Sequence, residues 1–386
     1  MKKKIAILGS TGSIGKNLIN ILKKDKNNFE IVLLTAEKNF QELLKQAKLF
    51  KVKNLIITNK QSYFKLKKMK MKNVKIFNDY SSLKKILENK IDYSMSAISG
   101  LAGLSPTISI IKYSKLIAIA NKESLICGWN LIKKELKKNK TDFIPVDSEH
   151  FSLWYGLQNT NSNNLEKIFL TASGGPFYNK PLKDFSKIKI SEALKHPNWK
   201  MGKKISIDSA TLINKIYEVI EAKNIFDINY NKIEILIHPK SYVHALLKFN
   251  NGLSKLIVHD TTMKIPIFNT LYPNYEKKLQ SKNINIKLLN NLNFKKVDSK
   301  IFPMIKLLNL LPKKNSLYET AIVSANDKLV ELFLANKIKF NDIHKKLFKL
   351  IKQKNILRLR DKYPVKCSDI IELNNYVRLK ISQNII

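Results

Sequence analysis

Three acidic residues on two distant segments have the chemistry of a divalent-cation site. Asp147 and Glu149 follow a short apolar run, Phe143–Val146, and residues two apart in extended chain project to the same side. Two converging carboxylates repel each other unless a cation joins them, and such hard oxygen ligands suit Mg²⁺ or Mn²⁺. Two solvated acids at a strand end would explain the same pattern. His150 has no second histidine at helical spacing, so zinc is not indicated.

The segment from Asp208 to Glu221 contributes the third acid. Asp208 or Ser209 can cap a helix, on which Asn214 and Glu218 would share one face because they are four residues apart. With Lys215 alongside, that face offers a grip for a phosphate and one metal ligand. The alternative is a surface ion pair between Lys215 and Glu218, which would contribute little to stability.

Two polar loops extend the set of candidate residues. Ser173 is followed by paired glycines in TASGGPF, residues 171–177, and exposed backbone N–H groups beside a hydroxyl can hold an anion. The same letters also make a good turn. Trp199 and Met201 lie in HPNWKMG, residues 196–202, where they would form either an apolar lid over a polar ligand or a loop anchored to the core by Trp199.

A glycine-rich turn near the N-terminus is typical of a nucleotide site. Gly9, Gly12 and Gly15 stand in ILGSTGSIG between an expected strand and helix, where they allow a pyrophosphate to approach the helix N-terminus. About twenty positions further on, Glu37 could hold the ribose hydroxyls of NAD. Lys38 could instead pair with the 2′-phosphate of NADP, so these residues leave the cofactor open.

The surrounding elements predict an α/β fold. Strands are expected at residues 5–8, 31–35, 55–58, 92–97, 116–120 and 143–146, with helices near 14–24 and 40–50, and this alternation predicts a Rossmann-like, doubly wound parallel sheet. Further strands are expected at 167–171, 233–237, 245–249 and 254–259. The expected domains are a nucleotide-binding domain (1–147), an α+β catalytic domain (148–272), a connecting arm (273–299) and a C-terminal helical domain (300–386).

Composition narrows the class of protein. The 386 residues carry a formal charge of +40, yet only Arg358, Arg360 and Arg378 among the 70 basic residues are arginines. Because the lysines are spread along the chain, the charge indicates solvated faces and favours an anionic ligand, with neither nucleic acid nor membrane as a partner. Two cysteines exclude a disulfide framework. The protein is expected to be soluble and cytoplasmic.

Taken in order, these motifs resemble the 1-deoxy-D-xylulose 5-phosphate reductoisomerase family over essentially the whole chain. The similar segments are ILGSTGSIG, ANKESL (Ala120–Leu125), PVDSEH (Pro145–His150), TASGGPF, HPNWKMGKKISIDSATLINK and IHPKSYVH (Ile237–His244). The resemblance implies isomerisation of a small phosphorylated sugar by a retro-aldol/aldol rearrangement, followed by reduction with NADPH. It also implies a divalent cation, Mg²⁺ or Mn²⁺, and a homodimer.

The resemblance also implies roles for individual residues. The metal ligands would be Asp147, Glu149 and Glu218, and the catalytic residues Lys122, Glu149 and His196. Substrate contacts would come from Lys122, Ser148, Glu149, Ser173, His196, Trp199, Met201, Ser209, Asn214, Lys215 and Glu218. NADPH would contact Thr11, Gly12, Ser13, Ile14, Glu37, Lys38, Asn39, Asn121, Glu123 and Gly202.

One departure concerns the cofactor. Glu37 occupies a position where the family usually has glycine, and a carboxylate there would repel a 2′-phosphate unless it points away. An alternative function is a dehydrogenase that acts on another phosphorylated hydroxy acid or semialdehyde with NAD(P) and without isomerisation. That alternative leaves the three carboxylates unexplained.

Overall fold

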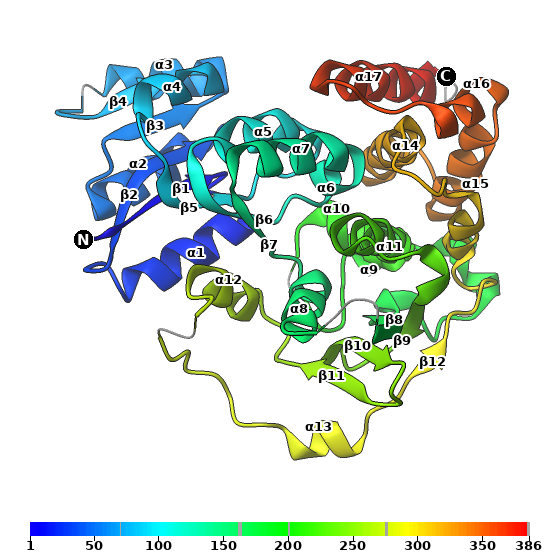
Figure 1. Cartoon of the computed structure of the whole chain (residues 1–386). Helices are drawn as coiled ribbons and strands as arrows, with labels where there is room; N and C mark the ends of the chain where they lie inside the picture. The colour runs from blue at the N-terminus through cyan, green and yellow to red at the C-terminus, as the bar shows by residue number, and fades with distance from the viewer. Residues whose placement is uncertain (70, 161–163, 200, 275–276, 384–386) are drawn as a thin grey trace. The chain divides into compact units, whose positions relative to one another are not determined.

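The structure is a computed structural model that describes residues 1–69, 71–160, 164–199, 201–274 and 277–383 (Figure 1). The chain divides into two compact units. The first comprises residues 1–124, 131–151 and 263–280, and the second comprises residues 125–130, 152–262 and 281–386. The division into four domains expected above stays a prediction.

The first unit is built on a seven-stranded parallel sheet, as expected. Its strand order is β4-β3-β2-β1-β5-β6-β7, and the bounds are β1 (Lys3–Leu8), β2 (Phe29–Ala36), β3 (Asn54–Ile57), β4 (Lys75–Phe77), β5 (Ile91–Ser96), β6 (Ser114–Ile119) and β7 (Asp142–Pro145). The strand order reverses between β1 and β5. In such sheets a ligand binds at that reversal, beyond the carboxyl ends of the strands.

Helices cover the sheet of the first unit. They are α1 (Ser13–Lys23), α2 (Phe40–Phe50), α3 (Lys60–Lys68), α4 (Leu83–Ile86), α5 (Leu104–Ile111) and α12 (Lys264–Leu271). The late helix α12 packs beside α1 (Figure 1), and Thr270 on it bonds the buried Tyr93 hydroxyl at 2.9 Å. Three more helices contain residues of both units: α6 (Lys122–Cys127), α7 (Trp129–Asn139) and α8 (Ser148–Leu157).

The second unit contains a mixed sheet in the order β11-β10-β8-β9-β12. Its strands are β8 (Leu165–Ala172), β9 (Ile233–Ile237), β10 (Val243–Phe249), β11 (Ser254–Val258) and β12 (Lys295–Lys296). Strands β8 and β9 are parallel, and the other pairs are antiparallel. A hairpin turn joins β10 to β11, and Gly252 in this turn has a φ of +83°.

Helices make up the rest of the second unit. They are α9 (Ile190–Ala193), α10 (Lys203–Ala210), α11 (Ile213–Phe226), α13 (Ile286–Asn290), α14 (Leu317–Leu334), α15 (Phe340–Ile351), α16 (Lys354–Leu357) and α17 (Cys367–Gln383). Helix α11 is buried on nearly every side, so it forms part of the core. The expected C-terminal helical domain, 300–386, begins with a 3₁₀ helix, Pro303–Leu310. Within the described residues, no helix combines the length and apolar character of a membrane span.

Candidate active site

The turn between β1 and α1 needs glycine at two positions. Gly9 has a φ of +79°, and a Cβ there would lie 2.7 Å from the carbonyl oxygen of Ala97. A Cβ on Gly15 would lie 2.5 Å from the carbonyl oxygen of Gly9. Because glycine has no side chain at either position, the turn can lie tightly against the end of β5. No side chain caps α1 at Gly12, which suits a helix N-terminus that binds an anion.

The other residues expected to contact NADPH lie on turns and helix starts of this unit, except Gly202, the N-cap of α10. Thr11 and Gly12 lie in the β1–α1 turn, Ser13 and Ile14 begin α1, and Glu37 and Lys38 follow β2. The Lys38 ammonium lies 3.3 Å from the Glu37 carboxylate, and both side chains are about 70% exposed. The positive charge of Lys38 therefore lies beside the negative charge of Glu37 and offsets it. Asn39 caps α2 by accepting the N–H of Glu42.

Asn121 joins two loops at the carboxyl end of the sheet. Its amide donates to the carbonyl oxygen of Gly100 at 2.8 Å, and its side-chain oxygen accepts the N–H of Ser124 at 2.6 Å. The loop after β5 is thereby fixed to the start of α6. Lys122 and Glu123 occupy the first turn of α6, and Glu123 is buried.

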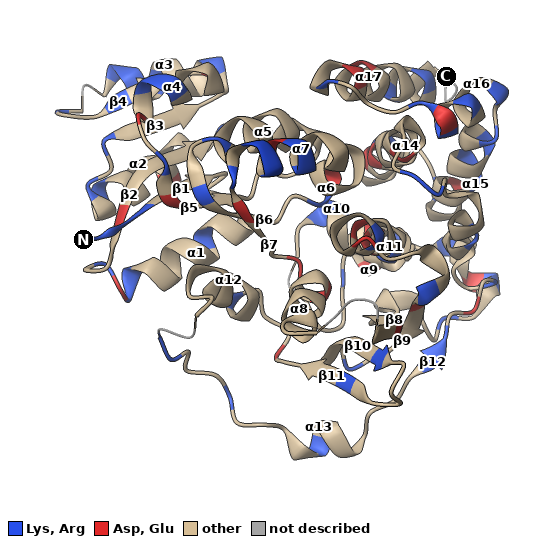
Figure 2. Ribbon diagram, viewed as in Figure 1, with Lys and Arg blue, Asp and Glu red and all other residues tan. Residues whose placement is uncertain are grey.

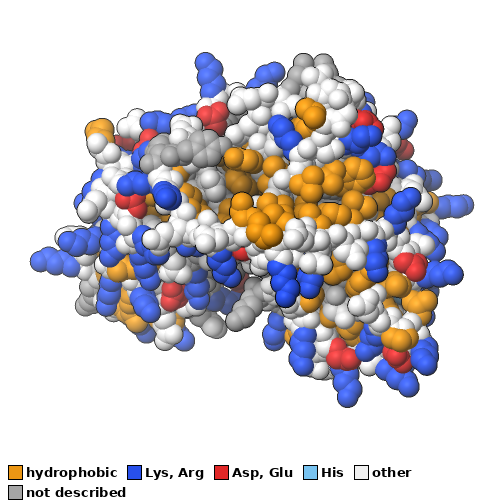
Figure 3. Space-filling view, turned by 90° about the horizontal axis from the view of Figure 1, so that it is seen from below, with side chains coloured by type: hydrophobic (Ala, Val, Ile, Leu, Met, Phe, Trp, Pro, Cys, Tyr) orange, Lys and Arg blue, Asp and Glu red, His pale blue; other side chains and the backbone are white. Residues whose placement is uncertain are grey.

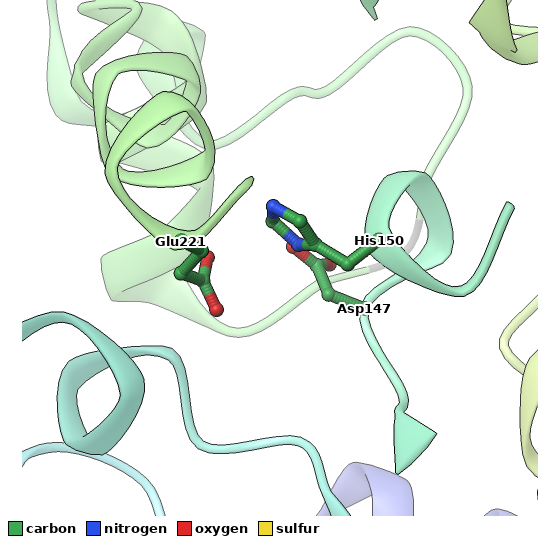
Figure 4. A group of neighbouring side chains, drawn as sticks. All are labelled: Asp147, His150 and Glu221. Atoms are coloured by element: carbon green, nitrogen blue, oxygen red, sulfur yellow. The ribbon is translucent and has the colours of Figure 1, made fainter. Parts of the chain in front are cut away.

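The Asp147 carboxylate lies between two basic side chains of the first unit. Lys122 forms an ion pair with it, and His150 Nδ1 lies 3.3 Å from the same oxygen. Burial by itself would raise the pKa of Asp147, but Lys122 and His150 outweigh it and hold that pKa well below its usual range. Asp147 is therefore a carboxylate at neutral pH. Figure 4 shows the His150 ring beside it and labels Glu221 on α11.

The extended-chain argument for Asp147 and Glu149 was wrong. Strand β7 ends at Pro145 and α8 begins at Ser148, so Glu149 lies in the first turn of a helix, where the helix dipole stabilises an acid. The chain turns early because Asp147 starts α8: its carbonyl oxygen accepts the N–H of Phe151 at 2.7 Å. The Ser148 hydroxyl bonds the Glu149 carboxylate.

In the second unit, Ser173 is held as a hydrogen-bond donor. His196 Nδ1 accepts the N–H groups of Asn198 and Trp199 at 3.2 and 3.0 Å, so His196 Nε2 carries the proton and donates to the Ser173 hydroxyl at 2.9 Å. The N–H of Gly175 donates to the same oxygen at 3.0 Å. With two donors already on its oxygen, Ser173 has its own hydrogen to offer to an anion.

His196 is neutral because of where it lies. Burial and then the nearby Lys215 ammonium lower the pKa of His196 to about 4. Because the charge of Lys215 on α11 acts on His196, the two side chains lie within electrostatic range of each other. Ser209 adjoins this group as well, because a Cβ on Gly175 would lie 3.1 Å from the carbonyl oxygen of Ser209. We call Ser173, His196, Ser209 and Lys215 the anion cluster.

The turn between α10 and α11 differs from the expected capped helix start. Asp208 and Ser209 lie within α10, and the N-cap of α11 is Leu212, a buried leucine with a φ of +65°. A positive φ is rare for a bulky side chain and costs stability. Burial of the Leu212 side chain offsets this cost. The sharp turn joins the end of α10, which carries Ser209, directly to the start of α11, which carries Lys215.

Helix α11 carries a buried polar group, so the alternative of a surface ion pair was also wrong. Lys215 pairs with Glu218, and their side chains are only 5% and 1% exposed. The Asn214 amide donates to the other Glu218 oxygen at 2.5 Å. A buried carboxylate needs such partners, and these contacts hold Glu218 in a fixed orientation.

The segment around Trp199 packs on the second sheet. The Asn198 amide donates to the Pro239 carbonyl oxygen at 2.6 Å and to the Ser241 hydroxyl at 2.8 Å. The Trp199 ring meets the His244 ring edge-on, with 6.1 Å between centroids. Met201 is half-buried, whereas Lys200 lies outside the described residues. These contacts hold the segment near the anion cluster.

Sequence reasoning missed three features. Glu221 was given no role at the end of the Asp208–Glu221 segment, although its side chain is fully buried one turn beyond Glu218. His150 was set aside as a zinc ligand for lack of a second histidine, but its Nδ1 lies 3.3 Å from an Asp147 carboxylate oxygen. No local sequence pattern indicated a role for Asn326, because its hydrogen-bond partner Asp208 is 118 positions away.

Known proteins match the chain along its length. The family model described as 1-deoxy-D-xylulose 5-phosphate reductoisomerase matches residues 5–128, the one described as its C-terminal domain matches 143–226, and the DXP reductoisomerase C-terminal domain matches 259–380. The 1-deoxy-D-xylulose 5-phosphate reductoisomerase of Pelagibacter ubique is 62% identical over 98% of this chain and 99% of its own. That of Wolbachia pipientis is 41% identical over 79% of this chain and 78% of its own.

Solved structures match as well. A DOX-P reductoisomerase in complex with NADPH, fosmidomycin and magnesium aligns with a TM-score of 0.90 at 31% identity, over 99% of this chain and 98% of that one. The Zymomonas mobilis enzyme in complex with NADPH aligns with a TM-score of 0.87 at 29% identity, over 100% of this chain and 99% of that one.

Proposed function

The chain belongs to the 1-deoxy-D-xylulose 5-phosphate reductoisomerase family. From this premise we propose which of its residues bind the substrate, the metal ion and NADPH. The protein converts 1-deoxy-D-xylulose 5-phosphate to 2-C-methyl-D-erythritol 4-phosphate, using NADPH and a divalent metal ion. The observation that carries the assignment of residues is the anion cluster of the second unit, which has the chemistry to bind the phosphate group.

We assign the phosphate of the substrate to Ser173, Ser209, Asn214 and Lys215. Ser173 offers its hydroxyl hydrogen, because its oxygen already accepts two donors. Lys215 brings a positive charge to the first turn of α11, where the helix dipole also favours an anion. Neutral His196 holds Ser173 in place without competing for the phosphate.

We assign the metal ion to Asp147, Glu149 and Glu218, which can each offer one carboxylate oxygen to an ion. Their hard oxygen atoms fit Mg²⁺ or Mn²⁺, and the low pKa of Asp147 keeps that ligand charged. When bound, the ion supplies Lewis-acid polarisation of the substrate carbonyl group. Asp147, His150 and Glu221 could offer a second ligand set, but its imidazole suits Mg²⁺ less well.

Lys122 and Ser148 complete the reacting end of the site in this proposal. The Lys122 ammonium, oriented by Asp147, holds a proton that it can share with a substrate oxygen. Glu149 adds a carboxylate beside the Ser148 hydroxyl. Trp199 and Met201 cover the bound sugar and exclude water, which would compete with the rearrangement.

We assign NADPH to the carboxyl end of the first sheet. Gly9 and Gly15 let the β1–α1 turn pack tightly where a side chain would clash with the backbone, and Thr11, Gly12, Ser13 and Ile14 would contact the cofactor from this turn and the start of α1. Lys38 would meet the 2′-phosphate, with Glu37, Asn39, Asn121, Glu123 and Gly202 as further contacts. NADPH supplies the hydride. The pairing of Glu37 with Lys38 reduces the repulsion that the carboxylate would otherwise cause.

We further propose a homodimer formed through strand β11. This strand ends its sheet and pairs only with β10 among the described residues, and an unpaired edge invites a second chain. Leu256 on this strand and Leu253 in the turn before it are 41% and 66% exposed, and Figure 3 shows hydrophobic side chains gathered on one face of the molecule. A cytoplasmic location is also proposed, in keeping with the low cysteine content of the chain, two in 386 residues.

The assignment is tested by following the oxidation of NADPH by the purified protein. Turnover should require both 1-deoxy-D-xylulose 5-phosphate and Mg²⁺ or Mn²⁺, and NADH should replace NADPH poorly. Glu149→Gln should lower kcat by at least about a hundredfold, because it removes one metal ligand. Glu166→Gln, an exposed acid on β8, is the matched control. A Glu149→Gln variant with most of its activity would refute the metal assignment.

A further inference from the structure

Helices α10 and α14 are joined by a polar network, buried at Asp208 and Asn326, that the assignment of the site does not use. Asn326 of α14 donates from its amide to one oxygen of Asp208 at 2.8 Å. Lys204, one turn before Asp208 on α10, lies 3.3 Å from the other oxygen and 2.9 Å from Asp327 of α14. We call these four residues the α10–α14 bracket.

The bracket places Asp208 and Asn326 at buried positions, where polar groups carry a cost in stability. Asp208 is 2% exposed and occupies the last turn of α10, and the negative end of a helix dipole repels a carboxylate. Asn326 is fully buried, and its side-chain oxygen has no hydrogen-bond partner among the described residues. Buried polar groups of this kind do not add stability over an apolar packing. Such a network is better explained by the geometry that it fixes.

That geometry concerns Ser209, the residue after Asp208. Ser209 is half-exposed, and its carbonyl oxygen and the Ala210 backbone lie against Gly175 of the Ser173 loop. Three residues later the chain takes the strained turn at Leu212 into α11. A shift at the end of α10 would therefore move Ser209 relative to both Ser173 and Lys215.

We propose that Asp208 and Asn326 are positioning residues, which lock the end of α10 so that the Ser209 hydroxyl stays aligned with Ser173 and Lys215 for phosphate binding. The proposal rests on the proposed function of the anion cluster. It assigns to α14, in the C-terminal part of the chain, a role in the affinity for the phosphorylated substrate. Neither residue contacts the substrate in this account.

Asn326→Asp tests the proposal because it keeps the shape of the side chain and replaces the donor with a second carboxylate facing Asp208. We expect the KM for 1-deoxy-D-xylulose 5-phosphate to rise about tenfold, with the KM for NADPH changed less than about twofold. The double variant Asp208→Asn/Asn326→Asp reverses the donor and the acceptor, and we expect it to recover most of the substrate affinity.

Asn315→Asp is the matched control. Asn315 is also a buried asparagine just before α14, and its amide donates to the Ile126 carbonyl oxygen at 2.8 Å, far from Asp208 in the chain. It should lower the Tm as Asn326→Asp does while leaving the substrate KM unchanged. Equal effects of both variants on the KM, or no recovery in the double variant, would overturn the positioning role.

Binding of inorganic phosphate gives a readout that does not depend on turnover. Phosphate should raise the Tm of the wild-type protein and of Asn315→Asp, and should raise it much less for Asn326→Asp. If the wild-type protein binds phosphate but does not turn over, the proposed function fails while the bracket is still tested. If Asn326→Asp responds to phosphate as the wild type does, the bracket proposal fails.

Discussion

At the scale of single residues, the site depends on side chains that are paired before any ligand arrives. His196 is neutral and fixed in one tautomer, so it donates to Ser173 and adds no charge. Lys215 and Glu218 form a buried ion pair, so each has its partner in place. Preorganised groups of this kind lose little freedom when the substrate binds.

Glu319 shows the opposite situation, a buried acid without full compensation. Burial raises the pKa of Glu319 to about 7 from its ordinary value of 4.5, although Ser316 and Lys223 act to lower it. The folded protein therefore binds this proton more tightly than the unfolded chain does. The resulting stability is complete below about pH 4.5 and is lost as the pH rises to about 7.

Glu319→Gln should remove this pH dependence. Relative to the variant, the wild-type free energy of unfolding should fall by a few kcal/mol between pH 4.5 and pH 7, because only the wild type has a carboxyl group to ionise. Urea denaturation of both proteins at pH 5 and pH 8 measures this difference. A constant difference between the two proteins at both pH values would refute the assignment of the raised pKa.

At the scale of elements, the β1–α1 turn makes the strictest demand on the sequence. Gly9→Ala would place a Cβ 2.7 Å from a backbone oxygen and keep a φ of +79°. Gly252→Ala, in the β10–β11 turn, has a similar φ but nothing within 4 Å. The second variant therefore carries the backbone strain alone.

We expect Gly9→Ala to lose at least about 2 kcal/mol more stability than Gly252→Ala, since only the former must also move backbone atoms. It should also weaken NADPH binding, whereas Gly252→Ala should not. Thermal unfolding and titration with NADPH measure the two effects. Similar losses in both variants would show that the clash at Ala97 is relieved at no cost.

Elements with a clear period were predicted well from the sequence. The glycine turn, the α2 helix and the β9 strand lie where the apolar spacing puts them. Strands β4 and β12 were missed because three and two residues carry no periodic signal. Helix α17 falls within the expected C-terminal helical domain, but its bounds carried no clear period, because only Ile370, Val377 and Ile381 are buried along its 17 residues.

The candidate site was predicted from motifs rather than from local geometry. Asp147 and Glu149 were assigned to a metal site for a reason that α8 contradicts, because the chain turns into a helix where an extended segment was expected. Asp208 was expected to cap a helix, but its partner is Asn326 on α14. Such long-range pairs cannot be read from spacing, since nothing in the local sequence specifies the partner.

At the scale of the whole molecule, the net charge and the edge strand β11 determine which ligands and protein partners are favoured. The formal charge of +40 comes from lysines spread over the helices and strands of both units (Figure 2). Solvated lysines of this kind attract anions in general and are screened by salt. The charge therefore favours capture of a phosphorylated substrate without defining a nucleic-acid surface.

The proposed dimer is tested at its strand edge. Leu256→Lys places a charge on the exposed side of β11 and should convert the dimer to a monomer, because like charges would face each other across the two-fold axis. Leu379→Lys, on the exposed face of α17, should leave the dimer intact. Light scattering measures the mass in solution. A monomeric wild type, or a dimeric Leu256→Lys variant, would contradict the proposed interface.

The carbon skeleton of the product tests the central claim most directly, because it separates a reductoisomerase from a simple dehydrogenase. The protein would be incubated with ¹³C-labelled 1-deoxy-D-xylulose 5-phosphate, NADPH and Mg²⁺, and the product examined by NMR. We predict the branched 2-C-methyl-D-erythritol 4-phosphate, formed only when the metal ion is present. An unbranched reduced sugar phosphate, or reduction that continues after the metal is chelated, would contradict the account.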